Sequence, residues 1–499
     1  MLFNSYGFVF FFLPVVLLVL FGVARGRKYG MPWLVLASLF FYGWWDVRYV
    51  PLLLVSIGFN YLVGKRLECL ASTEGRQDDC DSGQDAPFAA RKRKAWLVAG
   101  IVGNLLLLGY FKYTDFFLGV VNDAAGRMVF DLPRIVLPLG ISFYTFTQTA
   151  YLVDAYRGLA RNPSFVAYLE FVTIFPHLIA GPIINHKDMM PQFLDEANYH
   201  VRWDNMAKGI TLFMMGLFKK VVIADNLAPW ANDAFARPDA LSFLEAWAGA
   251  FAYTMQLYFD FSGYSEMAIG LGLLLNLRLP MNFDSPYRAT SIIDFWRRWH
   301  MTLGLWVKNY LYIPMGGNRH GTWRKMRNLF VSMVIIGFWH GAGWTFIAWG
   351  ALHGVMLVVN HAWRTLQIKL PKVLCWWMTF VGVLACLVVF RAATLHDAMT
   401  MLCAMTDIYH TVLPIHRAET LGWLQMFGAQ FAPMSDHLPV LKALAVCSCL
   451  LVCTLIFKNP VRCMESFHTS WKWFTLVCLL GVIALYQMDH YTEFLYFQF

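Results

Sequence analysis

Charged residues are scarce in this 499-residue chain. They make up 14% of the sequence, against about 25% of a typical soluble domain, while hydrophobic residues make up 58%. This composition excludes an ordinary soluble globule. Apolar stretches of about 17 to 25 residues recur along the chain, each long enough to cross a hydrocarbon core of about 30 Å as a helix. We count roughly ten to thirteen of them, which predicts an all-α polytopic membrane protein with transmembrane or re-entrant helices.

Motifs of several soluble enzyme classes are also missing. The sequence contains no GxSxG nucleophile elbow, no P-loop, no HExxH zinc motif and no GxGxxG that opens a dinucleotide fold. The sequence therefore gives no evidence for ATP hydrolysis or zinc-dependent proteolysis. The ten cysteines include no CxxC pair and lie mostly in apolar runs, so we expect small buried thiols, no metal site and no bound cofactor.

Basic residues in the N-terminal loops are biased to one side. Residues 25–28 follow the first apolar stretch, 65–66 follow the third, and the run RKRK at 91–94 precedes the fourth. The positive-inside rule places all three groups in the cytoplasm and the N-terminus outside. The first stretch, 8–24, has no preceding basic residue or cleavage site, which favours a retained span over a signal peptide. The net charge of +9 is mostly this loop bias, so we expect lipid contacts and no nucleic-acid partner.

We expect a single integral membrane domain over residues 1–499, with three distinct segments. Residues 67–94 combine acidic and small residues with a basic run and predict a cytoplasmic loop. Residues 406–438 hold histidines, prolines and mixed charge, and predict an extramembrane loop. Residues 291–320 are too short and polar for a plain span, which predicts a re-entrant or interfacial element. Between 135 and 365 Pro, Gly and ionisable residues interrupt the apolar runs, so we expect the functional cavity there.

Two histidines lie in the run GFWHGAGWTFIAWGALHG at 337–354. The glycines at 341–343 should end the helix that reaches His340 and leave its ring at a helix end inside the membrane. Such a ring is either a hydrogen-bonded structural histidine or a general base, and membrane depth favours the base. His353 follows thirteen residues later, and Asn360 lies on its helix face seven residues further on. We favour a structural polar stripe between helices for this second pair, and keep both residues as candidates for lining the cavity or orienting a catalytic group.

A third histidine, His300, lies beside Arg297 and Arg298 in the aromatic segment FWRRWH. A guanidinium fork there could bind a phosphate-bearing donor, and Lys308 is a further candidate for this role. The alternative for basic residues here is a positive-inside loop that contacts anionic lipid. That alternative accounts well for the cluster at 319–327, but less well for two arginines inside an aromatic element.

Three further ionisable residues lie in apolar surroundings. Asp260 and Glu266 occur in LYFDFSGYSEMAIGLG, where a carboxylate must be paired or protonated. Each either orients a histidine or an arginine, or joins helices without chemistry. His177 sits between two prolines in FPHLIAGPI, a pattern typical of a broken helix that lines a cavity. We interpret His177 as part of the cavity wall.

The motifs FWRRWH, LYIPMGGNR and FWHG together resemble the membrane-bound O-acyltransferase (MBOAT) family, and the resemblance covers nearly the whole chain. The chain looks closest to the branch that O-acetylates alginate and more distantly resembles the teichoic-acid D-alanylation branch. The resemblance implies a helical disc around a central funnel. His340 matches the family's essential histidine and His300 its second histidine. The implied enzyme moves an acetyl group from acetyl-CoA across the bacterial inner membrane to a periplasmic acceptor for exopolysaccharide O-acetylation.

The resemblance leaves the acceptor open among alginate, cellulose, peptidoglycan and other exopolysaccharides. Transfer could go directly to the glycan or through a periplasmic acetyltransferase or carrier protein. Functions of another class are the alternative: a proton-coupled transporter, in which His340, Asp260 and Glu266 would relay protons, or an export scaffold.

Overall fold

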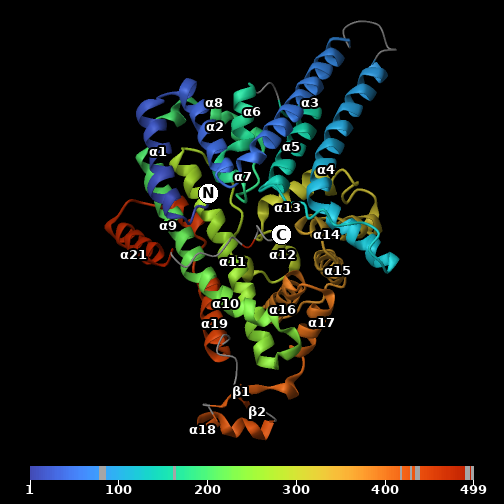
Figure 1. Cartoon of the computed structure of the whole chain (residues 1–499), viewed down its shortest axis with the longest axis vertical. Helices are drawn as coiled ribbons and strands as arrows, with labels where there is room; N and C mark the ends of the chain where they lie inside the picture. Colours follow the sequence, from blue (N-terminus) through green and yellow to red (C-terminus); the bar gives the residue numbers. More distant parts are fainter. Residues whose placement is uncertain are drawn as a thin grey trace. The chain divides into compact units, whose positions relative to one another are not determined.

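The structure is a computed structural model that describes residues 1–77, 86–160, 164–415, 418–427, 430–432, 439–488 and 495. The described residues are mostly helical, with one pair of short strands (Figure 1). Where the sequence predicts a single domain, the contacts group the chain into two compact units. Unit 1 comprises Met1–Phe213 and Ser265–Met281, and unit 2 comprises Met214–Tyr264 and Asn282–Phe499.

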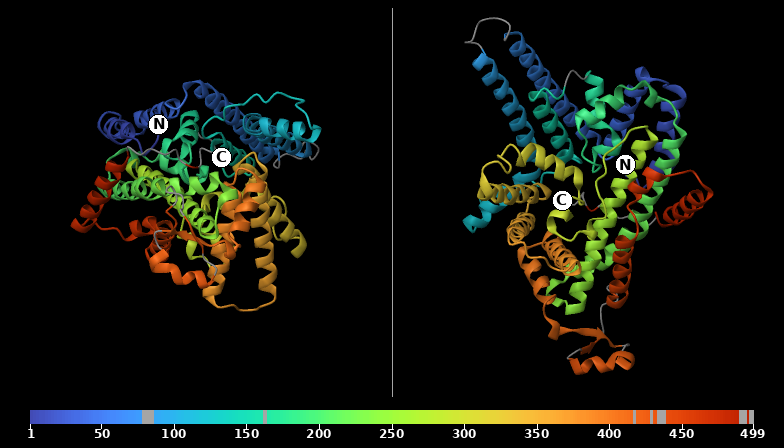
Figure 2. Two further views of the ribbon diagram at one scale, coloured as in Figure 1. Left: turned by 60° about the horizontal axis from the view of Figure 1, so that its bottom comes forward. Right: turned by 180° about the vertical axis from the view of Figure 1, so that it is seen from behind.

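Unit 1 contains the N-terminal helices. Its α-helices are α1 (Leu13–Leu18), α2 (Arg27–Gly43), α3 (Val50–Gln77), α4 (Ala86–Ala125), α5 (Ile141–Tyr156), α6 (Phe165–Thr173), α7 (Phe175–Leu178), α8 (His186–Leu194) and the first part of α9 (Trp203–Phe218). Helices α3 and α4 run side by side along part of their length (Figures 1 and 2). They occupy most of the segment 67–94 that the sequence predicts as a loop. Its Leu, Ala, Glu and Arg residues are good helix formers, so α3 continues to Gln77 and α4 begins at Ala86; residues 78–85 lie outside the described part of the chain.

Unit 2 contains the longest buried segment and the C-terminal helices. Its α-helices are α10 (Asp225–Ala236), most of α11 (Phe243–Leu274), α12 (Ile292–Trp296), α13 (Met301–Val307), α14 (Gly321–His340), α15 (Trp344–Thr365), α16 (Lys372–Arg391), α17 (Leu395–Ala404), α18 (Ala418–Leu421), α19 (Val440–Ile456), α20 (Pro460–Cys463) and α21 (Trp471–Gln487). Helix α11 is buried along almost its whole length, because most of its side chains are apolar or small.

Five of the described helices are long and apolar enough to cross a membrane. They are Val47–Ala71, Ala90–Ala125, Trp344–Thr365, Lys372–Arg391 and Val440–Ser466. Other long helices, such as α11 and α14, contain charged residues that interrupt their apolar runs, so fewer helices qualify than the apolar stretches counted in the sequence. The prediction of an all-α polytopic membrane protein is confirmed. The disc and the funnel remain implications of the family resemblance.

The segment 406–438 contains a small sheet. Strand β1 (Val412–Pro414) pairs in parallel with β2 (Gln430–Ala432), and Leu413 lies opposite Phe431. Together with α18, the strands lie beyond α17, at the end of unit 2 away from α12 and α13 (Figures 1 and 2). Parts of this segment are outside the described residues, and its extramembrane position stays a prediction.

Candidate active site

Helices α14 and α15 approach each other closely through two glycines. A Cβ added to Gly337 would lie 2.3 Å from a backbone oxygen of α15, and one added to Gly350 would lie 2.4 Å from a backbone oxygen of α14. Only glycine permits so close an approach of two helix backbones. His340 and His353 each follow one of these glycines by three residues. The crossing therefore fixes the positions of both histidines.

His340 is the last residue of α14, and the glycines at 341–343 separate it from α15, as the sequence predicts. Its ring is surrounded by aromatic side chains: the centroids of Trp339, Trp349 and Phe390 lie 4.9, 5.2 and 5.5 Å away. The residue is 7% exposed. Aromatic contacts thus surround the imidazole, which lies at a helix end where backbone carbonyls lack helical partners.

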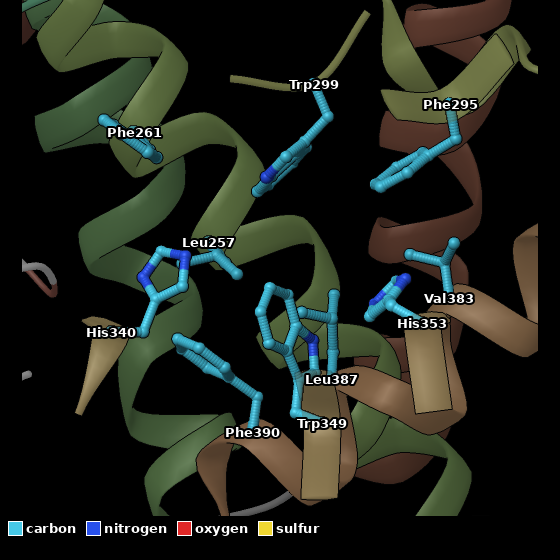
Figure 3. Close-up of a pocket in the computed structure, with 10 residues that line it drawn as sticks. All are labelled: Leu257, Phe261, Phe295, Trp299, His340, Trp349, His353, Val383, Leu387 and Phe390. Carbon is cyan, nitrogen blue, oxygen red and sulfur yellow. The ribbon is translucent and has the colours of Figure 1, made fainter. Parts of the chain in front are cut away.

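A small cavity in unit 2 brings His340 and His353 into one site (Figure 3). Its volume is about 30 Å³, which is room for about two water molecules. The lining residues are Leu257, Phe261, Phe295, Trp299, His340, Trp349, His353, Val383, Leu387 and Phe390. The sequence favours a structural role for His353 and keeps it as a cavity or orienting candidate, and the structure places it in the cavity wall. The repeated spacing Gly-x-x-His in the two helices is the signal that could have revealed it.

The hydrogen bond to His353 determines where that ring carries its proton. Trp296 donates its Nε1–H to His353 Nδ1 over 3.3 Å. An indole nitrogen can only donate, so Nδ1 accepts and the neutral imidazole carries its proton on Nε2. Trp349 lies between the two histidines, with its ring centroid 5.2 Å from His340 and 4.8 Å from His353 (Figure 3).

His300 is held in a strained turn next to this cavity. Its φ of 44° lies in the left-handed region, which a non-glycine residue adopts only where its surroundings enforce it. Here Asn282 supplies the constraint: its side-chain oxygen contacts His300 Nδ1 at 3.0 Å and accepts a hydrogen bond from Thr302. Phe261 packs edge-on against His300, with centroids 4.9 Å apart, and also lines the cavity. His300 itself is not among the lining residues.

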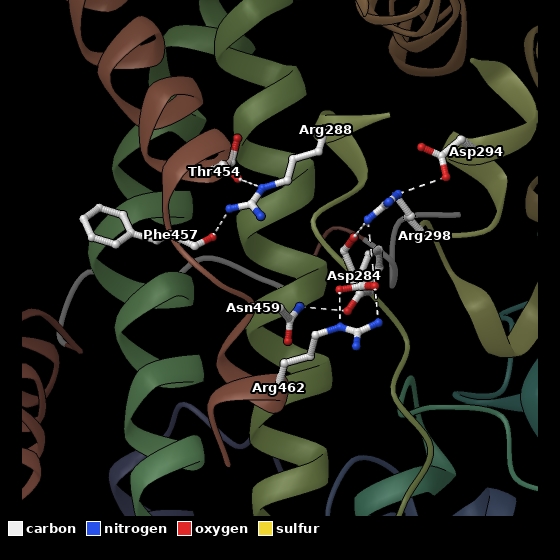
Figure 4. Close-up of polar contacts among 9 residues, drawn as sticks. Asp284, Arg288, Asp294, Arg298, Thr454, Phe457, Asn459 and Arg462 are labelled. Atoms are coloured by element: carbon white, nitrogen blue, oxygen red, sulfur yellow. Dashed lines mark hydrogen bonds and ion pairs between the residues drawn. The ribbon is translucent and has the colours of Figure 1, made fainter. Parts of the chain in front are cut away.

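Arg298 is bound to carboxylates (Figure 4). Its Nε lies 3.1 Å from Asp294, and it donates to the backbone carbonyl of Asp284 over 3.2 Å. Asp284 also accepts two hydrogen bonds from Arg462, at 2.8 and 2.6 Å. These bonds from Arg462 hold the pKa of the Asp284 carboxyl below its ordinary value. The geometry argues against the predicted phosphate-binding role of Arg298, because its guanidinium is already bound to Asp294 and to the backbone of Asp284.

The other two basic candidates are exposed. Arg297 follows α12, and Lys308 begins the π-helical turn Lys308–Tyr312 after α13. The segment 291–320 consists of these short helices and turns, none of which is long enough to span a membrane. Arg297 and Lys308 therefore remain available to a ligand, and their role as donor-binding residues stays a prediction.

The two predicted buried acids have different surroundings. Asp260 lies 2.8 Å from the amino group of Lys220, which also contacts Asp225 at 2.6 Å. All three side chains are buried, so this ion cluster satisfies the need of a buried carboxylate for a cation. The partner of Asp260 is thus a lysine and not a histidine or an arginine, which leaves open the other alternative from the sequence, pairing between helices without chemistry. Glu266 is buried in the part of α11 that belongs to unit 1.

His177 takes a structural position, and Asn360 is not among the residues that line the cavity. His177, in unit 1, lies 3.0 Å from the carbonyl oxygen of Pro182 through Nδ1 and 3.2 Å from the Thr147 hydroxyl through Nε2. Asn360 lies two turns beyond His353 on α15 and is not a lining residue. Within the described part of the chain, no three His, Cys, Asp or Glu side chains gather as ligands for a metal ion.

The comparison with known proteins gives the class of this enzyme. The model of MBOAT, the membrane-bound O-acyltransferase family, matches residues 127–389, a range that contains His300, His340 and His353. The chain belongs to this family and is a membrane-bound O-acyltransferase, as its resemblance predicts.

Individual relatives extend the match over the whole chain. The chain is 40% identical to a peptidoglycan O-acetyltransferase of Helicobacter pylori, over 100% of this chain and 98% of that protein. It is 41% identical to a probable alginate O-acetylase, AlgI, of Pseudomonas putida, over 100% of both chains. A teichoic acid D-alanyltransferase of Streptococcus thermophilus is more distant, at 28% identity over 45% of this chain and 57% of that protein.

Proposed function

We propose that this protein transfers an acetyl group from acetyl-CoA in the cytoplasm to an acceptor hydroxyl on the periplasmic side of the bacterial inner membrane, for O-acetylation of a cell-surface polysaccharide. The two relatives that match over the whole chain support the acetyl group, because each is named for O-acetylation. The basic N-terminal loops support a periplasmic N-terminus. The cavity volume of about 30 Å³ supports a short acyl group.

The observation that carries the proposal is the position of His340 at a helix end in the wall of this cavity. His340 acts as general base and removes the proton of the acceptor hydroxyl as its oxygen attacks the thioester carbonyl carbon. The C–S bond then breaks, and the leaving thiolate takes the proton from His340. Proton transfer by a positioned side chain typically contributes about 10² to 10⁴-fold to the rate.

His300, the second histidine of the proposed mechanism, lies next to the cavity and does not line it. Asn282 holds His300 in place, and His300 contacts the ring of Phe261, which lines the cavity. We assign it to the donor side, where exposed Arg297 and Lys308 on the same segment supply positive charge for the phosphates of coenzyme A. A shift of Phe261 would bring His300 into contact with the thioester.

The acceptor is a hydroxyl of a polysaccharide or of a periplasmic acetyltransferase or carrier protein that passes the acetyl group on. Full-length relatives are named for peptidoglycan and for alginate, so both polymers are candidates. The alternative of a proton-coupled transporter is less well supported, because Asp260, one of its three relay residues, is already paired with Lys220.

The test is replacement of His340 with alanine in cells that depend on this protein. We expect O-acetylation of the surface polymer, measured as acetate released by base, to be lost while the amount of protein in the membrane is unchanged. His396→Ala, at an exposed histidine of the same unit, is the matched control and should retain acetylation. Normal acetylation in the His340→Ala strain would contradict the proposal.

The transporter alternative has its own test. Purified protein should consume acetyl-CoA only when an acceptor is present. Acetate uptake into vesicles without thioester consumption would instead support transport.

A further inference from the structure

The indole nitrogen of Trp349 is buried without a protein acceptor. Trp349 is 4% exposed, and its Nε1 has no hydrogen-bond partner among the described residues. Leaving a buried N–H without an acceptor costs free energy, so native proteins rarely do so away from a functional site. Because Trp349 lines the cavity between His340 and His353 (Figure 3), this donor lies at the site where the acyl group would react.

Three other tryptophans of unit 2 have an acceptor for the indole N–H within the protein. Trp376 donates its indole N–H to the backbone oxygen of Tyr287 over 2.7 Å. Trp247 donates to the backbone oxygen of Met405 over 2.9 Å. Trp296 donates to His353, as described above. These three indoles have acceptors within the protein, whereas Nε1 of Trp349 has none among the described residues.

We propose that Trp349 is a catalytic residue whose Nε1–H donates a hydrogen bond to the carbonyl oxygen of the acyl donor and stabilises the negative charge that develops on it. This rests on the proposed acetyl transfer. As the acceptor oxygen bonds to the carbonyl carbon and His340 takes its proton, the π electrons of the C=O bond move onto the oxygen beside Trp349. When they return, the C–S bond breaks and the thiolate sulfur receives the proton from His340.

The residues that line the cavity favour a neutral carbonyl group as the ligand over a phosphate. The lining residues other than the two histidines and two tryptophans are hydrocarbon, and they include no lysine or arginine. A phosphate would therefore be desolvated without a countercharge, whereas a neutral carbonyl needs only one donor. A neutral N–H in such an apolar site stabilises developing charge more strongly than it would in water.

The experiment removes the N–H in two variants, of which one keeps the size of the bicyclic ring and the other does not. Trp349 is replaced by 3-benzothienylalanine, in which sulfur takes the place of the indole nitrogen, and separately by phenylalanine. Turnover of acetyl-CoA is measured in membrane vesicles that contain the full chain and the acceptor. In both variants we expect kcat to fall about 100-fold, as on loss of an oxyanion donor, with KM nearly unchanged. The benzothienyl variant should keep its thermal stability, because it keeps the ring volume and loses no hydrogen bond to the described residues. The phenylalanine variant should be less stable, because the smaller ring leaves a cavity.

Trp376 provides the matched control. The same replacement there removes a hydrogen bond to Tyr287, so we expect a lower melting temperature and an unchanged kcat. A second readout needs no turnover: 13C-labelled S-acetonyl-CoA, a stable ketone analogue, should show its carbonyl stretch at lower frequency when bound to the wild-type protein than to the benzothienyl variant at position 349.

Each outcome is decisive. Unchanged kcat and an unchanged carbonyl frequency in the Trp349 variants would overturn the assignment while leaving acetyl transfer by the wild-type chain intact. A rise in KM alone would also overturn it, because it would indicate ground-state binding of another part of the donor. Absence of acetyl-CoA turnover by the wild-type protein would instead overturn the proposed function, and this inference with it.

Discussion

His177 in unit 1 and His340 in unit 2 are both buried histidines next to a break in a helix, yet their rings have different surroundings. Both nitrogens of His177 lie within hydrogen-bond distance of protein oxygens, those of Pro182 and Thr147. His340 is packed among aromatic rings and lines a cavity. A backbone carbonyl can only accept, so His177 must keep a proton on Nδ1.

This difference shows that burial at a helix break does not by itself mark a functional histidine. A ring whose two nitrogens both have protein partners joins segments of the backbone and cannot exchange a proton without breaking those bonds. A ring in a cavity wall can meet a substrate. The same sequence pattern, a histidine among prolines or glycines, thus occurs in a structural setting in unit 1 and in the cavity wall of unit 2, where we propose that the histidine acts as a base.

The largest effect should follow from separating α14 and α15. Gly350→Val places a side chain where a single Cβ would already lie 2.4 Å from a backbone oxygen, so one helix must move and both histidines move with it. Overpacking of this kind costs roughly 3 kcal/mol. We expect a loss of O-acetylation together with a marked fall in melting temperature, measured by size-exclusion chromatography of the detergent-solubilised protein after heating.

The control for this substitution is a helical glycine with open space around it. A Cβ added to Gly109 on α4 meets no atom within 4 Å, and alanine is the better helix former by about 1 kcal/mol. Gly109→Ala should therefore leave the melting temperature unchanged or raise it. If Gly350→Val behaved like Gly109→Ala, the close approach of the helices would not be what positions His340.

The position of His340 could be predicted from the sequence because it depends on local chemistry. Glycines directly after the residue end the helix, and the surrounding residues are apolar over more than a helical turn. The helical membrane fold follows from composition for the same reason. Both features can be predicted without knowing which helices contact each other.

The cavity role of His353 and the anchoring of Arg298 depend on contacts between segments that are distant along the chain. His353 reaches the cavity only because α14 and α15 cross at their glycines. Arg298 is bound by Asp284, whose other partner, Arg462, lies 178 residues further along the chain. Hydrophobic periodicity and motif spacing in one sequence carry no information on such pairings.

A smaller effect, on stability alone, should follow from removing His177. His177→Ala leaves the buried carbonyl of Pro182 without its donor, which costs about 2 kcal/mol. We expect a lower melting temperature but normal acetylation per folded molecule, because His177 holds two backbone segments together. The exposed His396 is again the control, since surface substitutions usually change stability by less than about 0.5 kcal/mol. Lost activity in fully folded His177→Ala protein would erase the distinction between the two histidines.

The smallest effect should follow from removing the charge of Asp284, which binds Arg462 through its carboxylate and Arg298 through its backbone carbonyl. Its pKa is lowered by the hydrogen bonds from Arg462, so the ionised carboxylate stabilises the folded chain above its unfolded-state pKa of about 4, and this stability is lost as the pH falls through the folded pKa. Because Arg462 is half exposed, solvent screening limits the effect of Asp284→Asn to about 1 kcal/mol at neutral pH.

The pH dependence separates this anchor from a general loss of packing. The difference in melting temperature between wild type and Asp284→Asn should be constant from pH 7 to about pH 5 and shrink below about pH 4, where the wild-type carboxyl also becomes protonated. Asp239→Asn, at an exposed acid of the same unit, should show no difference at either pH. A difference in melting temperature for Asp284→Asn that persists unchanged at pH 3 would mean that the shape of the side chain matters and its charge does not. The ion pairs of Arg298 and Arg462 would then contribute nothing measurable to the stability of the segment that carries His300.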